Sequence, residues 1–153
     1  MSYLSNINDC PLWFLILVVL LVPILYLATK KSVISFLIPY VLLIIGETLI
    51  FRTVSTEPRF QFELFWSYKI WSYYWFEIIA NIIVFIPLGI LLCKLFGWKG
   101  VIFAILFSTG IEIIQLVSRR GLFEFDDIFN NSLGSIIGGV TTMLIKKRVK
   151  KNN

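Results

Sequence analysis

The sequence predicts an all-α integral membrane protein, a small bundle of five transmembrane helices with an aromatic segment at the outer interface. Of the 153 residues, 58% are hydrophobic and only 15% are charged, and the mean hydropathy is +0.87. Five apolar runs of about 17–20 residues are each long enough to cross a hydrocarbon core of ~30 Å as a helix. Helices are required because lipid cannot satisfy unpaired backbone groups. We expect one transmembrane domain over residues 1–153.

The five spans are predicted at residues 12–29, 33–51, 78–96, 101–117 and 128–145. We do not interpret the first as a cleaved signal peptide, because Met1–Pro11 has no basic residue. The long connection at residues 52–77 is rich in Trp, Tyr and Phe, and the first two favour the headgroup region. It lies at the outer surface either as a short amphipathic helix or as a loop packed on the bundle.

The basic residues predict the orientation of the chain. Nine of the 14 lie in short connections or in the tail: Lys30, Lys31, Lys94, Lys99, Lys146, Lys147, Arg148, Lys150 and Lys151. An odd number of spans places all nine on one side. The positive-inside rule then predicts a multi-pass protein of a bacterial cell membrane, with the N-terminus outside and the C-terminus cytoplasmic. The same pattern is typical of contacts with anionic membrane lipids, and we expect no nucleic-acid partner.

The residue types exclude several chemistries. The chain has no histidine, which excludes a histidine base, a serine–histidine triad and most zinc-hydrolase sites. Cys10 and Cys93 form no metal-binding motif, and because they are predicted on opposite sides of the membrane we expect no disulfide between them. No cofactor is expected.

Polar side chains of four spans fall at the outer ends of those spans. They are Glu47, Glu77, Asn81, Glu112, Gln115, Asp127 and Asn131. Span order alone places them in one leaflet, whichever side is outside. A charged group in lipid is costly without a partner, so the cluster is a candidate functional site. We hypothesise that these side chains line a single pocket facing the cell exterior.

Helical spacing supports a shared site. Glu112, Gln115 and Arg119 lie on one stripe, which Ser108 continues inward, and Glu77 and Asn81 are one turn apart. Asp127 and Asn131 line the same face as Gly134 and Gly138. That G-x-x-x-G spacing would let the fifth span approach a neighbour closely.

Each of these residues also has a structural interpretation. The amides of Asn81, Gln115 and Asn131 can simply form bonds between helices worth about 0.6–2 kcal/mol. Asp126 and Asp127 precede a helix and can cap its first N–H groups.

The acidic residues of the spans have a similar alternative. The Glu112 carboxylate needs a partner, which Arg52, Arg119 or Arg120 can supply in a purely structural ion pair. Glu47 can pair locally with Arg52.

Four short motifs occur in a fixed order: Phe51–Thr53, Asn81–Gly89, Glu112–Gln115 and Arg119–Gly134. They resemble the F-R-T, N-I-x-x-F-x-P-x-G, E-x-x-Q and R…D-x-D-D-x-x-x-N-T-L-G motifs of the VanZ-like family of small membrane proteins. Together the motifs are specific, whereas each one alone is weak.

The match to the family is not complete. Glu124 stands where the family usually has Asp, and Ser132 where Thr is common. Spacing fits either Arg119 or Arg120 as the family arginine, and we favour Arg119.

The resemblance implies a role in low-level resistance to teicoplanin, a lipoglycopeptide antibiotic, or in outer-face envelope physiology. Teicoplanin carries an acyl chain and targets peptidoglycan precursors at the outer leaflet. The partners to consider are therefore membrane lipids, the acylated drug and a lipid-linked peptidoglycan precursor. The candidate binding residues are Arg52, Asn81, Glu112, Gln115, Arg119, Asp126, Asp127 and Asn131.

Two functions remain open. As a binding protein, the chain would use Arg52 and Arg119 for phosphate or carboxylate and apolar walls for an acyl chain. As an enzyme on a lipid-linked or acylated substrate, it would use Glu112 and Asp127 as general acid and base, or would hold a divalent metal with carboxylates and Asn131. An ion pathway is disfavoured because the inner halves of the spans have almost no polar relay.

Overall fold

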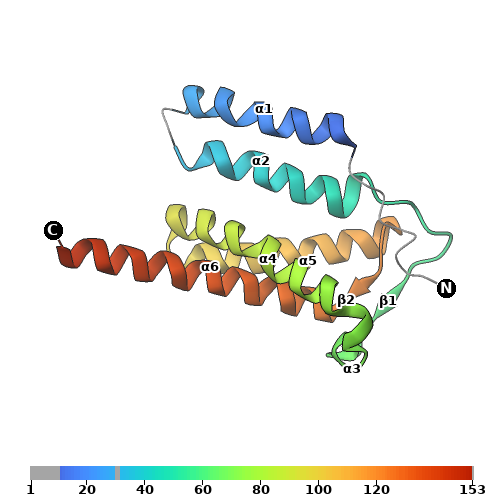
Figure 1. The fold of residues 1–153 in the computed structure, drawn as a ribbon. Helices are drawn as coiled ribbons and strands as arrows, with labels where there is room; N and C mark the ends of the chain where they lie inside the picture. The colour runs from blue at the N-terminus through green and yellow to red at the C-terminus, as the bar shows by residue number, and fades with distance from the viewer. Residues whose placement is uncertain (1–10, 30–31, 153) are drawn as a thin grey trace. The chain divides into compact units, whose positions relative to one another are not determined.

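The computed structural model describes residues 11–29 and 32–152 (Figure 1). The elements in chain order are α1 (Leu12–Ala28), α2 (Ile34–Ile45), the π-helical turn η2 (Gly46–Ile50), β1 (Phe60–Gln61), α3 (Trp66–Lys69), α4 (Trp71–Phe96), α5 (Lys99–Ser118), β2 (Phe123–Glu124) and α6 (Phe125–Asn152). The two short strands pair with each other. The expected all-α architecture with five apolar helices is confirmed.

The helices differ in their capacity to cross a membrane. By length and composition, α4, α5 and α6 can each span the bilayer, while α1 and the α2–η2 segment are shorter apolar helices. The sides on which the two termini lie remain predictions. The interpretations that rest on Met1–Cys10, Lys30 and Lys31 concern residues outside the described ranges.

Two helices are longer than the spans predicted from hydropathy. Helix α4 begins at Trp71 instead of residue 78, so the end of the aromatic connection is helical. No glycine or proline interrupts residues 71–77, and the interfacial aromatics simply continue the helix. Helix α6 extends to Asn152 instead of residue 145. Lys and Arg are good helix formers and interact favourably with a helix C-terminus, so the basic tail prolongs the helix.

The chain forms two compact units. The first consists of Met1–Gln61 with Gly110–Phe123, and the second of Phe62–Thr109 with Glu124–Asn153. Helix α5 is continuous and contributes its N-terminal half to the second unit and its last turns to the first.

In the first unit, α1 packs against the end of the α2–η2 segment. The rings of Phe14 and Phe51 are 4.9 Å apart between centroids, in an edge-to-face arrangement. A Cβ added at Gly46 would lie 2.5 Å from a ring carbon of Phe14. The glycine therefore allows this aromatic side chain to reach the backbone of η2.

In the second unit, α4 and α6 lie side by side and approach backbone to backbone (Figure 1). A Cβ at Gly134 would lie 2.1 Å from the carbonyl oxygen of Ile82, and one at Gly138 would lie 2.2 Å from that of Ile86. The close approach expected from the G-x-x-x-G spacing is confirmed. It fixes which side chains of the two helices can meet.

Candidate functional site

Polar side chains connect α6 to both α4 and α5 in the second unit. The Asn81 amide donates a 2.6 Å hydrogen bond to the Asp127 carboxylate. One turn later on α6, Asn131 Nδ2 donates to Ser108 Oγ at 2.9 Å. Asn131 is 5% exposed, and its Oδ1 has no hydrogen-bond partner within the described ranges. The structure thus brings together Asn81, Asp127, Asn131 and Ser108 on one face of α6.

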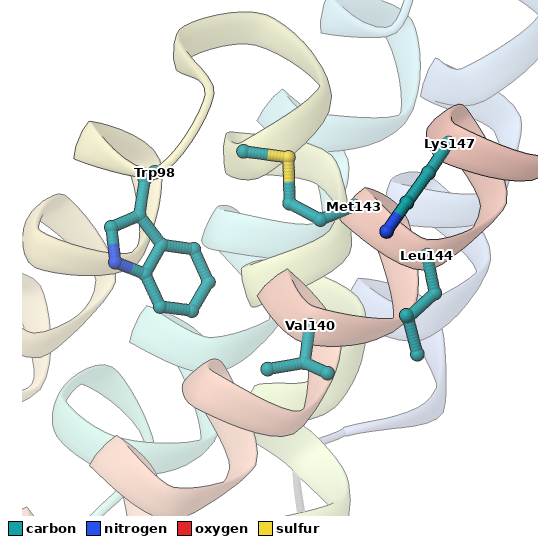
Figure 2. A pocket seen from close by; sticks show the side chains of 5 residues that line it. All are labelled: Trp98, Val140, Met143, Leu144 and Lys147. Carbon is teal, nitrogen blue, oxygen red and sulfur yellow. The ribbon is translucent and has the colours of Figure 1, made fainter. Parts of the chain in front are cut away.

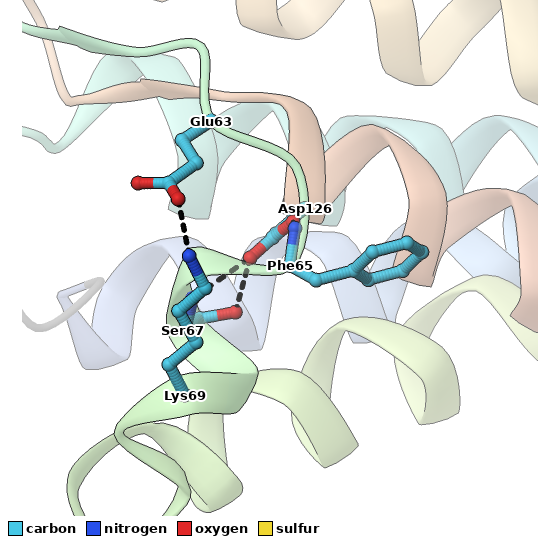
Figure 3. Close-up of polar contacts among 5 residues, drawn as sticks. All are labelled: Glu63, Phe65, Ser67, Lys69 and Asp126. Atoms are coloured by element: carbon cyan, nitrogen blue, oxygen red, sulfur yellow. Dashed lines mark hydrogen bonds and ion pairs between the residues drawn. The ribbon is translucent and has the colours of Figure 1, made fainter.

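Asp126 points to a different neighbour, the connection between the strands and α4. Its Oδ1 accepts a 2.5 Å hydrogen bond from the Phe65 N–H. Its Oδ2 accepts bonds from the N–H (2.9 Å) and the hydroxyl (2.5 Å) of Ser67. Figure 3 shows this clamp beside the exposed ion pair of Lys69 with Glu63. Asp126 therefore holds the short helix α3 against α6, and its role in ligand binding stays a prediction.

The clamp fixes an unusual backbone conformation. Phe65 has φ 62°, in the left-handed region that a bulky residue adopts only when its surroundings enforce it. The Phe65 ring packs edge to face on Phe129, with centroids 5.1 Å apart. Of the two sequence interpretations of the aromatic connection, the structure contains elements of both, because α3 is a short helix and its neighbours pack on α6.

Two polar residues of this region were missed from the sequence. The Tyr68 hydroxyl donates a hydrogen bond to Asn130 Oδ1. Burial raises the pKa of Tyr68, and the nearby negative charge of Asp126 raises it further. Asn130 is 1% exposed, and its Nδ2 has no partner within the described ranges. The sequence spacing could have indicated Asn130, because this residue is one helical turn beyond Asp126 and shares its face of α6.

In the first unit, the end of α5 is closed by backbone hydrogen bonds around a left-handed arginine. The Arg119 N–H bonds to the Leu116 carbonyl at 3.4 Å, and the Arg120 N–H to the Gln115 carbonyl at 3.0 Å. This is the Schellman pattern, in which the left-handed position is usually glycine. Arg119 has φ 58°, a conformation that costs a residue with a Cβ about 1 kcal/mol or more.

Two arginine side chains at the end of α5 form hydrogen bonds with the end of η2 and the segment that follows it. Arg120 Nη1 donates to the carbonyls of Leu49, Ile50 and Arg52 at 3.2, 2.8 and 3.3 Å. The last carbonyls of a helix lack intrahelical partners, and here the guanidinium satisfies them. Arg119 Nη1 donates to the Thr56 carbonyl at 3.0 Å.

The side chains of Gln115 and Arg52 both lie next to Gly121. Gln115 Nε2 donates to the Thr48 carbonyl at 3.1 Å. A Cβ at Gly121 would lie 2.9 Å from Arg52 Nη1 and 3.1 Å from Gln115 Oε1, and the φ of +137° also favours glycine. Gln115 is 2% exposed, and its Oε1 has no partner in the described part of the chain. Gly121 therefore makes room for the guanidinium beside a buried acceptor.

The interpretation of Glu112 as the ion-pair partner of an arginine stays a prediction. The open carbonyls at the end of η2 and in the following loop compete for Arg120 and Arg119. Glu112 is 2% exposed on α5, in the first unit.

The predicted site residues thus fall into two groups. Arg52, Glu112, Gln115 and Arg119 belong to the first unit, and Asn81, Asp126, Asp127 and Asn131 to the second. That they line a single pocket stays a prediction. Among the described residues, no group of three His, Cys, Asp or Glu side chains is placed to hold a metal ion.

Comparison with known proteins gives the same family as the motifs. The chain is 35% identical to the protein VanZ of Enterococcus faecium over 66 residues, which cover 40% of this chain and 41% of that protein. The alignment thus spans less than half the length of this relative. No solved structure matches the chain. The VanZ/LLP1 family profile matches residues 12–146, from the start of α1 into α6, and the chain therefore belongs to the VanZ/LLP1 family.

Proposed function

We propose that this protein protects cells weakly against teicoplanin by binding an anionic, acylated molecule at the outer leaflet. The ligand is the drug itself or a lipid-linked peptidoglycan precursor. The observation that carries the proposal is the set of three guanidinium groups in the first unit, those of Arg52, Arg119 and Arg120, of which that of Arg52 lies next to the buried side chain of Gln115.

Arg52 is the residue of this set best suited to a ligand. Its guanidinium is half-buried beside Gln115, whereas Arg119 and Arg120 already donate to backbone carbonyls. A partly buried cation is stabilised by an anionic partner, so a phosphate or carboxylate there would be favourable. Arginine binds both groups through paired hydrogen bonds.

The surroundings of Arg52 also suit an acyl chain. Ile50 and Val54, which flank it in the sequence, are 51% and 61% exposed. Apolar surface beside a cation fits a molecule with a charged head and a hydrocarbon chain. We therefore propose that the head group contacts Arg52 and Gln115 while the chain lies along the apolar helices.

Susceptibility assays test this proposal in cells that express the chain and its variants. We expect Arg52→Gln and Glu112→Gln each to abolish protection against teicoplanin at unchanged membrane abundance, measured by blotting. Arg148→Gln, a matched loss of charge in the exposed C-terminal part of α6, should retain it. Full protection by an abundant Arg52→Gln/Glu112→Gln double variant would refute the assignment.

One observation favours an enzyme as the second candidate. The hydrogen bond from Asn81 orients the Asp127 carboxylate, as a general base requires. Purified protein incubated with teicoplanin or with a lipid-linked precursor would be analysed by mass spectrometry. A ligand mass change that the Asp127→Asn variant does not produce would favour catalysis. An unchanged ligand that co-purifies with the protein would favour binding.

A further inference from the structure

A hollow of about 280 Å³ lies on the surface of the second unit, at the C-terminal part of α6 and the turn between α4 and α5. Figure 2 shows the five side chains that line it: Trp98, Val140, Met143, Leu144 and Lys147. Four are apolar and one is a cation at the end of the groove where the basic tail begins. We call this hollow the tail groove.

The wall formed by Trp98 is held in place by two glycines. Gly97 has φ +64° in the α4–α5 turn, and its N–H bonds to the Cys93 carbonyl at 3.0 Å. A Cβ at Gly139 would lie 2.9 Å from a ring carbon of Trp98, so the indole rests directly on the backbone of α6. Tryptophan favours the boundary between headgroups and hydrocarbon, and we expect the groove at that depth.

The floor of the groove consists of apolar side chains followed by the charged side chain of Lys147. Val140, Met143, Leu144 and Lys147 recur at intervals of three and four residues, so they share one face of α6. From Val140 to Lys147 the helix rises about 10 Å. That length fits the first part of an acyl chain followed by a headgroup.

Lys146 and Lys147, near the C-terminal end of α6, differ in their contacts. Lys146 Nζ donates to the Cys93 carbonyl at 3.4 Å and so contributes to the contact between α6 and α4. Lys147 has no hydrogen bond or ion pair with any residue of the described ranges, and its side chain lies beside the apolar lining (Figure 2). The Lys147 ammonium is therefore available to an anion from outside the protein.

We infer that the tail groove binds one anionic phospholipid of the surrounding membrane. An acyl chain lies along Val140, Met143 and Leu144 against the Trp98 ring, and the phosphate contacts Lys147. The neighbouring basic residues of the tail add attraction to the negative headgroup. On α6, Lys147 is about 30 Å along the helix from Asp127, so the tail groove is separate from the polar cluster of Asn81, Asp127 and Asn131.

Native mass spectrometry of the purified full chain tests the inference, with phosphatidylglycerol as the probe and phosphatidylcholine as its zwitterionic counterpart. We expect one tightly bound phosphatidylglycerol. Lys147→Gln should weaken its binding about fivefold, the effect of one cation near a membrane surface, and Lys147→Arg should restore it. Val140→Phe, which fills the groove, should weaken binding of both lipids.

Arg148→Gln is the matched control, because Arg148 is adjacent to Lys147 but points to another side of the helix. It should leave phosphatidylglycerol binding unchanged. Equal losses in Lys147→Gln and Arg148→Gln would overturn the inference, because attraction would then depend on net charge and not on the groove. Equal affinity for the two lipids, or a dimer that excludes lipid, would overturn it as well. Circular dichroism of each variant confirms that it is folded.

Discussion

The side-chain amide of Asn81 donates a 2.6 Å hydrogen bond to the carboxylate of Asp127, from α4 to α6. The two backbones are in contact along this stretch because Gly134 and Gly138 have no side chains to separate them. A carboxylate in an apolar environment is stabilised by every donor that reaches it. The bond therefore serves both helix association and the orientation of a candidate functional group.

A double-mutant cycle measures this relationship. Asn81→Ala, Asp127→Ala and the double variant should give a coupling free energy of about 0.6–2 kcal/mol in detergent unfolding, the range for polar bonds between membrane helices. Asn81→Ala combined with Ser132→Ala is the control, since Ser132 Oγ bonds to the Ile128 carbonyl of its own helix. Additivity for both pairs would contradict the expectation.

Substitution of the interface glycines should separate α4 from α6. Gly134→Ala would place a Cβ 2.1 Å from the Ile82 carbonyl oxygen, so we expect a loss of about 1–3 kcal/mol in unfolding free energy. Gly110→Ala is the matched control, because a Cβ there would meet nothing within 4 Å. It should be neutral or stabilise α5 by up to ~1 kcal/mol. Equal thermal stability of the two variants would speak against the tight interface.

Removal of the Asp126 carboxylate should release α3. Asp126→Ala eliminates the acceptor for the N–H groups of Phe65 and Ser67, and hydrogen bonds to a charged group contribute about 1.5–3 kcal/mol. We expect hydrogen exchange of both amides to accelerate at least about tenfold. Glu63→Gln, which removes only the exposed ion pair with Lys69, should leave their exchange unchanged. Unaltered exchange in Asp126→Ala would contradict the clamp.

Alkaline pH should weaken the same region through Tyr68. Its pKa is raised in the folded protein by burial and by Asp126, so folding favours the neutral phenol. This contribution is complete below the ordinary value of 10.0 and is lost as the pH rises through the folded pKa. Melting temperatures measured from pH 9 to 11.5 should therefore decline less steeply for Tyr68→Phe than for the native chain. Parallel declines would show that Tyr68 makes no such contribution.

Arg119 allows fold and function to be separated. Glycine adopts the left-handed conformation freely, so Arg119→Gly should be more stable than Arg119→Ala by about 1 kcal/mol. Both variants lose the guanidinium, and both should lose protection against teicoplanin if Arg119 contributes to the site. Thermal unfolding in detergent and susceptibility assays give the two readouts. If Arg119→Gly retained protection and the less stable Arg119→Ala lost it, Arg119 would serve only the turn.

The sequence was sufficient to predict the apolar helices and the close contact that α6 makes with a neighbouring helix. Hydropathy locates apolar runs because lipid tolerates little else, and the spacing of Gly134 and Gly138 indicated the face of α6 that meets a neighbour. The start of α4 lies before the predicted span because interfacial aromatics do not distinguish a loop from a helix. The pattern at residues 71–77 fits both.

The partners of the polar residues could not be read from the sequence. Asp126 bonds to Ser67, and Tyr68 to Asn130, across about 60 residues of chain, so only the tertiary fold brings them together. Charge alone made Glu112 one possible partner of the arginines, but it gave no indication of backbone acceptors. The carbonyls left open at the end of η2 are equally good acceptors, but nothing in the side-chain pattern reveals them.

The separation of Asn81 from Asp127 by 46 positions has a consequence for biogenesis. At bacterial elongation rates of roughly 5–20 residues per second, the acceptor is synthesised roughly 2 to 9 seconds after the donor. During that interval the amide has to be sheltered by the translocon, by water or by lipid headgroups. We expect α4 to complete its insertion only when α6 emerges, so that ribosome stalling between the two helices would leave α4 accessible to membrane proteases.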